Sequence, residues 1–362
     1  MSKSIQIILQ PLDYYFFGTN ETFNFGAKGI KNFTVKSNPF PQQTALLGVL
    51  RHALYTMGLP IGNSFDPEKE DQNFGLIEKI SPLYLLNEEN KVLFRAAWPS
   101  IKEEGSKVST ALDFAATGQA AIYNGCKSPG TFLSEKFDPK LEMEDTWMNL
   151  SKNGELVTGN DIFAEEQHIG IDKQKTISNR TDEGAFYRQQ YYRLKKTAFA
   201  FEVTLNDEVD EKKLPSLLPF GGEKRMFSIR YNTGSFASWA FIAEQLNSLF
   251  RARLNNLGQD AVFLATDCYI ADINQLESLL QFAAVKAKPF RNIITPSSVK
   301  NFSRLTDNDK IGDQLYKPQL TTYLLQQGGL LFPQPGKLAE VEKLLNQAAF
   351  QRIGYNYFIT NN

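Results

Sequence analysis

The sequence has very little cysteine and histidine. Its 362 residues include two cysteines, Cys126 and Cys268, and two histidines, His52 and His168. Two cysteines this far apart form neither a disulfide framework nor a zinc-ligand pattern, which is typical of a protein from a reducing compartment. We therefore expect no metal, no redox chemistry and no cofactor.

Long apolar runs are also missing. No stretch approaches the roughly 20 apolar residues that a membrane-spanning helix requires. The first ten residues, MSKSIQIILQ, do not contain the apolar core of a signal peptide. The sequence therefore predicts a soluble cytoplasmic protein without a membrane partner.

The common catalytic motifs are absent from the sequence. It contains no GxxxxGK[ST] loop, no HExxH, no paired CxxC and no GxSxG. Metal-free RNA cleavage by a general acid and base normally uses at least one histidine, so His52 and His168 are the only candidates for it. A structural role for His52 and a place in a basic segment for His168 are the simpler interpretations, and we predict no catalytic residue.

An excess of charge of one sign is missing as well. The chain has 39 Lys and Arg against 40 Asp and Glu, a formal net charge of -1, so any contact with RNA must come from local clusters. What the chain does contain is aromatic residues, with 28 Phe and 14 Tyr suited to core packing or base stacking. Its length indicates two domains or one large one.

Two segments concentrate positive charge. Residues 168–196 carry seven basic and three acidic side chains, with arginine and tyrosine interleaved. This pattern suits single-stranded RNA, because guanidinium groups meet phosphates and rings stack on bases, although a solvated hairpin face explains it equally well. Residues 286–304 carry five basic side chains and no acidic one, and this loop suits either RNA or an acidic protein partner.

The apolar spacing predicts a split arrangement of strands and helices. In the first half we expect, in order, strand 5–12, helix 42–58, an insertion, a hairpin of 185–196 with 197–206, a short helix within 210–220, and strand 226–232. This order, β-α-β-β-α-β, is that of a ferredoxin-like domain. For the second half we expect helix 238–256, strand 261–270, helix 274–285, strand 321–333, helix 338–350 and strand 355–359.

A glycine-rich segment, PFGGEKR at 219–225, follows the expected short helix. Gly221 and Gly222 allow the backbone to approach a phosphate and present its N–H groups, while Lys224 and Arg225 add positive charge. A tight turn with solvated charges is the alternative.

The start of the first helix is a second candidate anion site. Gln42, Gln43 and Thr44 lie where unpaired N–H groups and the positive end of the helix dipole favour an anion, although ordinary capping gives the same pattern. Arg51, one turn beyond Leu47, is either an exposed cation or a phosphate ligand.

Four motifs, in this order along the chain, resemble those of one protein family. They are PLDYYFFGTNETFNFG at 11–26, FPQQTALLGVLRHAL at 40–54, HIGIDKQKT at 168–176 with GAFYRQQYYRL at 184–194, and FGGEKR at 220–225. The chain thereby resembles the Cmr subunit three family of the RAMP superfamily, from type III-B CRISPR effector complexes. The resemblance implies an α+β fold of tandem ferredoxin-like (RRM-like) domains, 1–235 and 236–362, with a glycine-rich loop and an inserted β-hairpin thumb.

The resemblance also implies a function without catalysis. Such a subunit binds the 5′ handle of the crRNA beside the large polymerase-like subunit and a backbone RAMP subunit, and meets target RNA only indirectly. The alternatives are a RAMP-type endoribonuclease that processes precursor crRNA with His52 or His168, and a protein adaptor that never touches RNA.

By resemblance, particular residues are expected to contact the guide RNA. Those near the handle are Gly221, Gly222, Lys224, Arg225, Arg51, Gln42, Gln43 and Thr44. Those in the thumb are His168, Ile169, Asp172 and Thr176, with Arg180 and Arg188 adding charge. Where the family often has an arginine after the aromatic pair of the first motif, this chain has Gly18.

Overall fold

The computed structural model describes most of the chain. The described residues are 2–18, 33–67, 69, 71–97, 100–102, 108–110, 122–123, 145–152, 154–171, 186–255, 259–290 and 323–361. Three residues expected in the thumb, Asp172, Thr176 and Arg180, lie outside these ranges, as does the part of the 286–304 basic loop from residue 291 onward.

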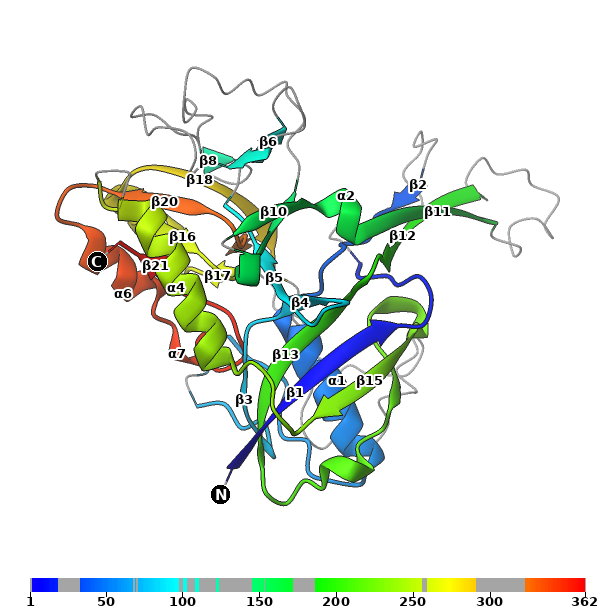
Figure 1. Cartoon of the computed structure of the whole chain (residues 1–362). Helices are drawn as coiled ribbons and strands as arrows, with labels where there is room; N and C mark the ends of the chain where they lie inside the picture. The colour runs from blue at the N-terminus through cyan, green and yellow to red at the C-terminus, as the bar shows by residue number, and fades with distance from the viewer. Residues whose placement is uncertain are drawn as a thin grey trace.

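The first half is organised by a long antiparallel sheet (Figure 1). Strand β1 (Ser2–Pro11) lies between β13 (Thr197–Asn206) and β15 (Met226–Asn232), and β13 also pairs with β3 (Ile77–Ile80). The local order is therefore β15-β1-β13-β3. The sheet continues through β4 (Tyr84–Asn87), β5 (Val92–Arg95), β9 (Thr146–Asn149) and β10 (Glu155–Thr158), and β14 (Leu217–Pro219) forms its other edge.

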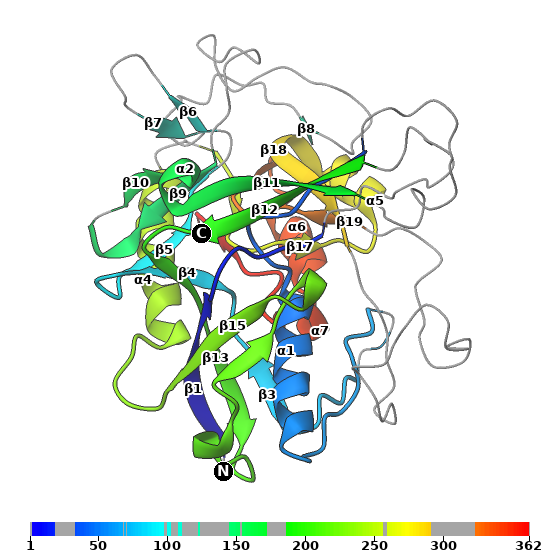
Figure 2. The same ribbon diagram turned by 90° about the vertical axis from the view of Figure 1, so that its right-hand side faces the viewer.

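Helix α1 (Gln43–Thr56) covers one face of this sheet, as Figures 1 and 2 show together. Its Leu46, Leu50 and Leu54 recur at helical spacing and are all buried. Alternate β1 residues, such as Ile5 and Ile7, face the same core because side chains of a strand alternate between the two faces. This packing fixes the start of α1 next to the sheet.

The second half contains another sheet with covering helices. Its central order is β21 (Phe358–Thr360), β16 (Val262–Leu264), β20 (Leu330–Pro333) and β18 (Leu280–Pro289), all antiparallel. The helices are α4 (Trp239–Asn255), α5 (Ile273–Leu279), α6 (Leu338–Leu345) and α7 (Ala348–Gln351). Strands β17 (Cys268–Tyr269), β19 (Tyr323–Leu325) and β8 (Ile122–Tyr123) complete this sheet, with β8 parallel to β18.

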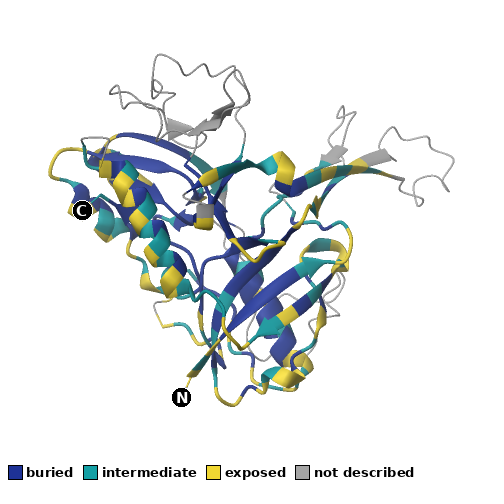
Figure 3. Cartoon of the chain, viewed as in Figure 1, coloured by how far each residue is buried: buried dark blue, intermediate teal, exposed yellow. Residues whose placement is uncertain are grey.

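The two halves share their hydrophobic cores, which appear as continuous buried strands in Figure 3. The ring of Phe350 lies 4.7 Å from that of Phe65, in the core beneath α1. On the other face of the first sheet, Ile8 of β1 belongs to the same cluster as Phe250 of α4 and Phe263 of β16. A third cluster belongs entirely to the second half. Both cores of the first half are therefore shared with the second half, whereas the second half also has a core of its own.

A β-hairpin projects away from both sheets (Figure 1). It consists of β11 (Phe163–Ile171) and β12 (Phe186–Leu194), and β2 (Phe33–Val35) pairs in parallel with β12. The remaining short elements are β6 (Ser100–Lys102), β7 (Val108–Thr110), α2 (Gly159–Ile162) and the 3₁₀ turns η1 (Leu150–Lys152), η2 (Glu211–Lys213) and η3 (Gly222–Lys224). No helix in the described ranges is long and apolar enough to cross a membrane.

Three of the secondary-structure predictions are wrong. Strands β12 and β13 do not pair with each other, because the chain leaves the projecting hairpin at Lys195–Lys196 and enters the large sheet. Residues 210–220 form the single turn η2 and then the edge strand β14, consistent with prolines at 215 and 219. The helix expected over 274–285 ends at Leu279, and the chain continues as β18 because β19 and β20 offer it strand partners.

Candidate functional site

The glycine-rich loop joins β14 to β15 and lies against the segment that follows β1. Gly221 has φ +83°, and a Cβ there would lie 2.6 Å from the carbonyl oxygen of Phe16. A Cβ on Gly222 would lie 2.6 Å from the Phe16 ring, and the Gly222 amide donates to the Phe16 carbonyl at 2.8 Å. Both glycines are therefore needed for close packing, and one of the expected anion-binding N–H groups is already used.

A cavity of about 320 Å³ opens beside this loop. It is lined by residues from the glycine loop, the start of α1 and the first motif, including Gly221, Gly222, Gln42, Thr44, Arg51 and Gly18. Phe17, Phe40 and Phe65 form aromatic walls, while Asn38 and Ser64 add an amide and a hydroxyl. Aromatic walls with a few polar groups suit a flat ligand that has hydrogen-bonding edges, such as a nucleobase.

The start of α1 is tied to the C-terminal part of the chain. The amide of Thr44 donates a hydrogen bond of 3.3 Å to the Tyr355 hydroxyl oxygen, and the Gln43 side chain donates to the Gly354 carbonyl at 3.3 Å. Gln43 is buried and does not line the cavity. Of the three residues predicted at this helix start, Gln42 and Thr44 therefore line the cavity, whereas Gln43 binds the C-terminal part of the chain instead.

Arg51 is not the exposed cation considered from the sequence. Its side chain is buried, and it donates to the carbonyls of Ile61 at 3.3 Å and Gly62 at 3.2 Å. Burial lowers the pKa of Arg51 to about 10. The guanidinium lines the cavity but is held by the loop that follows the helix.

Lys224 is the exposed cation of the glycine loop. It has φ +54°, and within the described part of the chain its ammonium group has no hydrogen-bond or ion-pair partner. It follows Gly222, which lines the cavity, by two residues, but Lys224 itself is not a lining residue. Lys224 is therefore available to an anionic ligand.

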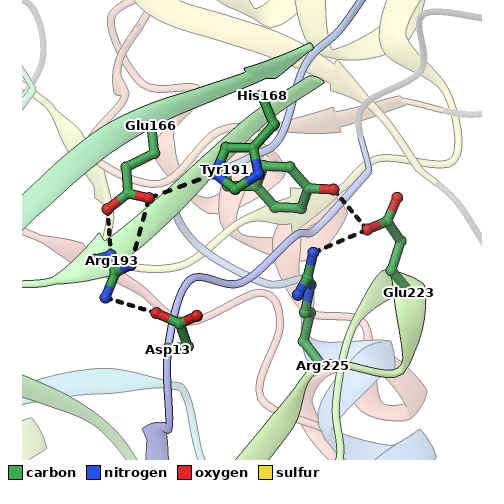
Figure 4. Close-up of polar contacts among 7 residues, drawn as sticks. All are labelled: Asp13, Glu166, His168, Tyr191, Arg193, Glu223 and Arg225. Atoms are coloured by element: carbon green, nitrogen blue, oxygen red, sulfur yellow. Dashed lines mark hydrogen bonds and ion pairs between the residues drawn. The ribbon is translucent and has the colours of Figure 1, made fainter. Parts of the chain in front are cut away.

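Arg225 has a different environment from Lys224. Its guanidinium lies 4.0 Å from the ring centre of Tyr14 and 4.9 Å from that of Tyr191. It also pairs with Glu223 at 3.3 Å (Figure 4). Glu223 also accepts a hydrogen bond of 2.6 Å from the Tyr191 hydroxyl. Arg225 thus connects the glycine loop to the hairpin.

The hairpin carries three of the predicted contacts that lie in the described ranges. The ring of His168 packs against Tyr14 and Tyr191, with centroids 4.5 and 4.8 Å apart, and its Nε2 lies 3.6 Å from Glu166. Ile169 is 68% exposed and the Arg188 side chain is also exposed. His168 is therefore part of an aromatic cluster, whereas Ile169 and Arg188 face solvent.

The second basic segment begins inside the protein. Lys288 forms an ion pair with the buried carboxylate of Asp267, and burial lowers the pKa of Lys286. These two lysines are not free surface charges, in contrast to the sequence interpretation. The rest of that segment is outside the described ranges.

The histidines do not form a site together. His52 lies on α1, where burial lowers its pKa, and neither it nor His168 lines the cavity. Among the residues that the structure describes, no group of His, Cys, Asp and Glu is arranged to hold a metal ion.

Sequence reasoning missed the partners of Arg225. In the sequence, Tyr14 and Tyr191 stand out only as members of the first and third motifs, and Glu223 lies between two glycines and two cations. The one available signal was a single carboxylate inside an otherwise basic GGEKR segment. No sequence pattern marks the cavity residues Asn38, Phe40 and Ser64 as part of a site.

Comparison with known proteins gives a family match over most of the chain. The model of a family described as "CRISPR-associated protein (Cas_Cmr3)" matches residues 7–104 and 134–360. Two solved chains, from cryo-EM structures of "the Type III-B Cmr-beta bound to cognate target RNA", one of them also with AMPPnP, are similar at 12% identity. Each alignment covers 98% of this chain and 96% or 95% of the other, with TM-scores of 0.49 and 0.45 respectively. No curated protein matched.

Proposed function

This chain belongs to the Cmr3 family of CRISPR-associated proteins, and from that premise we propose that it is a non-catalytic, RNA-binding subunit of a type III-B effector complex. In this proposal it holds the 5′ handle of the crRNA. The observation that carries the proposal is the cavity in which the glycine loop, the start of α1 and the first motif meet, with the exposed Lys224 in that same glycine loop. An unstacked base enters the cavity and a neighbouring phosphate meets Lys224.

The strand orders support a tandem ferredoxin-like fold. In the order β15-β1-β13-β3, the first strand is central and its neighbours come from later in the chain. The order β21-β16-β20-β18 repeats this pattern, with α5 after the first strand and α6 after the third. Both fit β-α-β-β-α-β connectivity, although the first half has only η2 in place of a second helix. We assign the two domains to residues 1–235 and 236–362.

The β11–β12 hairpin is assigned the thumb role. It projects from the body (Figure 1) and presents Arg188 and Ile169 to solvent, where a cation meets a phosphate and an apolar side chain meets a base. The large polymerase-like subunit and a backbone RAMP subunit are the protein partners that the family membership suggests. Target RNA is then met only through the assembled guide.

The experiment is to purify the tagged full-length chain together with the other subunits of its complex, and to sequence the bound RNA after crosslinking. We expect crRNA whose 5′ handle crosslinks to residues 221–224 or to the β11–β12 hairpin. Recovery of the complex without RNA would overturn RNA binding in favour of a protein adaptor. Cleavage of repeat RNA by the isolated chain, lost in His52→Ala or His168→Ala, would instead identify an endoribonuclease.

A further inference from the structure

Two separate sets of contacts hold the base of the β11–β12 hairpin. In the first, Tyr15 and Tyr192 exchange backbone hydrogen bonds of 2.8 and 3.1 Å, so the segment after β1 extends the hairpin at its base. Arg193 strengthens this side through ion pairs with Asp13, at 2.6 Å, and with Glu166. This first set therefore combines backbone hydrogen bonds with side-chain ion pairs, and it does not involve the glycine loop.

The second set consists only of side-chain contacts and connects the hairpin to the glycine loop (Figure 4). Glu223 accepts hydrogen bonds from the Tyr191 hydroxyl and from the Gln189 amide, both on β12. Burial, and then the hydrogen bond to Glu223, raise the pKa of Tyr191 to about 12, so the phenol remains a donor at neutral pH. Arg225 pairs with the same carboxylate and stacks on two tyrosine rings, Tyr14 and Tyr191.

The local charge argues against a direct phosphate contact by Arg225. Around the hairpin base, the cations Arg193 and Arg225 face three carboxylates, Asp13, Glu166 and Glu223. A phosphate placed at Arg225 would therefore have to displace Glu223 from the guanidinium. Lys224, next in the chain, has no such competitor among the described residues.

We propose that Glu223 and Arg225 are positioning residues that lock the hairpin to the glycine loop and set the direction in which it projects. The loop and the hairpin then move as one body, so that Lys224 and Arg188 contact the same RNA strand. The lock follows from the contacts alone, whereas its consequence for RNA depends on the function proposed above.

The first test measures amide hydrogen exchange along β11 and β12 in the full-length chain without RNA. Arg225→Lys keeps the charge but removes the planar stack, and Glu223→Gln weakens the hydrogen bonds. In both variants we expect exchange in the two strands to accelerate roughly tenfold, as loss of a cation–π contact or a charge-assisted hydrogen bond implies. Lys224→Ala, in the same loop, is the matched control and leaves the exchange unchanged.

The second test measures the salt dependence of RNA affinity in the assembled complex. Arg225→Gln should weaken binding without changing the slope of log affinity against log salt, because no phosphate contact is lost. A slope reduced by about 0.7 would identify Arg225 as a phosphate ligand and overturn the proposal. So would hairpin exchange that stays within twofold of wild type in both Arg225→Lys and Glu223→Gln. If the complex binds no RNA at all, the exchange result still decides the lock independently of the proposed function.

Discussion

The amide of Gly222 donates a hydrogen bond of 2.8 Å to the carbonyl of Phe16, joining the loop before β15 to the segment after β1. Because the first β-strand and its neighbour β15 are paired, the two segments leave the sheet side by side at the same end. The contact leaves no space for a side chain at either glycine. One wall of the cavity is thus determined by how closely two backbones approach.

Gly221→Ala should be strongly destabilising. Its φ of +83° and ψ of -162° belong to a region that is essentially restricted to glycine, and the new Cβ would collide with Phe16. We expect a loss of about 3 kcal/mol or more in the free energy of unfolding, measured by urea denaturation. Gly336→Ala is the control, since Gly336 has φ +77° but open space around it, and should lose only about 1–2 kcal/mol. Equal losses would show that the close approach contributes nothing.

Lys224→Ala should reduce RNA affinity without affecting stability. The side chain is exposed and has no partner within the described ranges, so its removal costs no folding contact. Loss of one phosphate contact should lower the salt slope for single-stranded RNA by about 0.7, measured by titration at several salt concentrations. Lys79→Ala, which removes an exposed lysine of β3 away from the cavity, is the matched control. If the slope of log affinity against log salt were unchanged in Lys224→Ala, the glycine loop would not be part of the RNA interface.

Arg51→Met should affect stability more than RNA binding. The substitution leaves the buried carbonyl of Ile61 and the partly buried carbonyl of Gly62 without this donor, and an unsatisfied buried group costs about 1–3 kcal/mol. We expect a loss of about 2 kcal/mol in the free energy of unfolding and an unchanged salt slope. The opposite pattern, normal stability with a reduced slope, would restore Arg51 as a phosphate ligand.

His52 should make the protein less stable in mild acid. Burial lowers the pKa of His52 below its usual 6.5, so the folded state prefers the neutral ring. The resulting contribution to stability is present above pH 6.5 and is lost as the pH falls through the lowered pKa. In urea denaturation between pH 7 and pH 5, His52→Gln should therefore lose less stability than wild type. Parallel curves for the two proteins would contradict this assignment.

Much of the fold and the family was predictable from the sequence. The leucine spacing in α1 predicted the helix to within two residues at each end, because one face of that helix is buried along its length. The family assignment, made on four ordered motifs, is confirmed by the family match. The α+β class with antiparallel sheets is also confirmed, while the finer ferredoxin-like assignment, the domain boundaries and the RNA contacts stay predictions.

The wrong predictions have a common physical cause. Whether a segment forms a strand, and whether a charged side chain is free or paired, depends on partners that are distant in the sequence. Residues 280–285 have helical composition but form part of β18, because neighbouring strands supply hydrogen bonds that local propensity does not include. Similarly, Lys224 and Arg225 are alike in sequence, yet only Arg225 meets two tyrosines and a carboxylate. The sequence order of these residues contains no information about that difference.

The shared cores have a consequence for how the chain folds. Phe350 and Tyr355 contribute to the core beneath α1, and the Tyr355 hydroxyl meets the amide of Thr44 at the start of that helix. A fragment that ends near residue 235 would lose this support and expose apolar surface, so it is expected to aggregate. The full chain should instead unfold in one cooperative transition, and the cavity beside the glycine loop should form only after residues 350–355 have been synthesised.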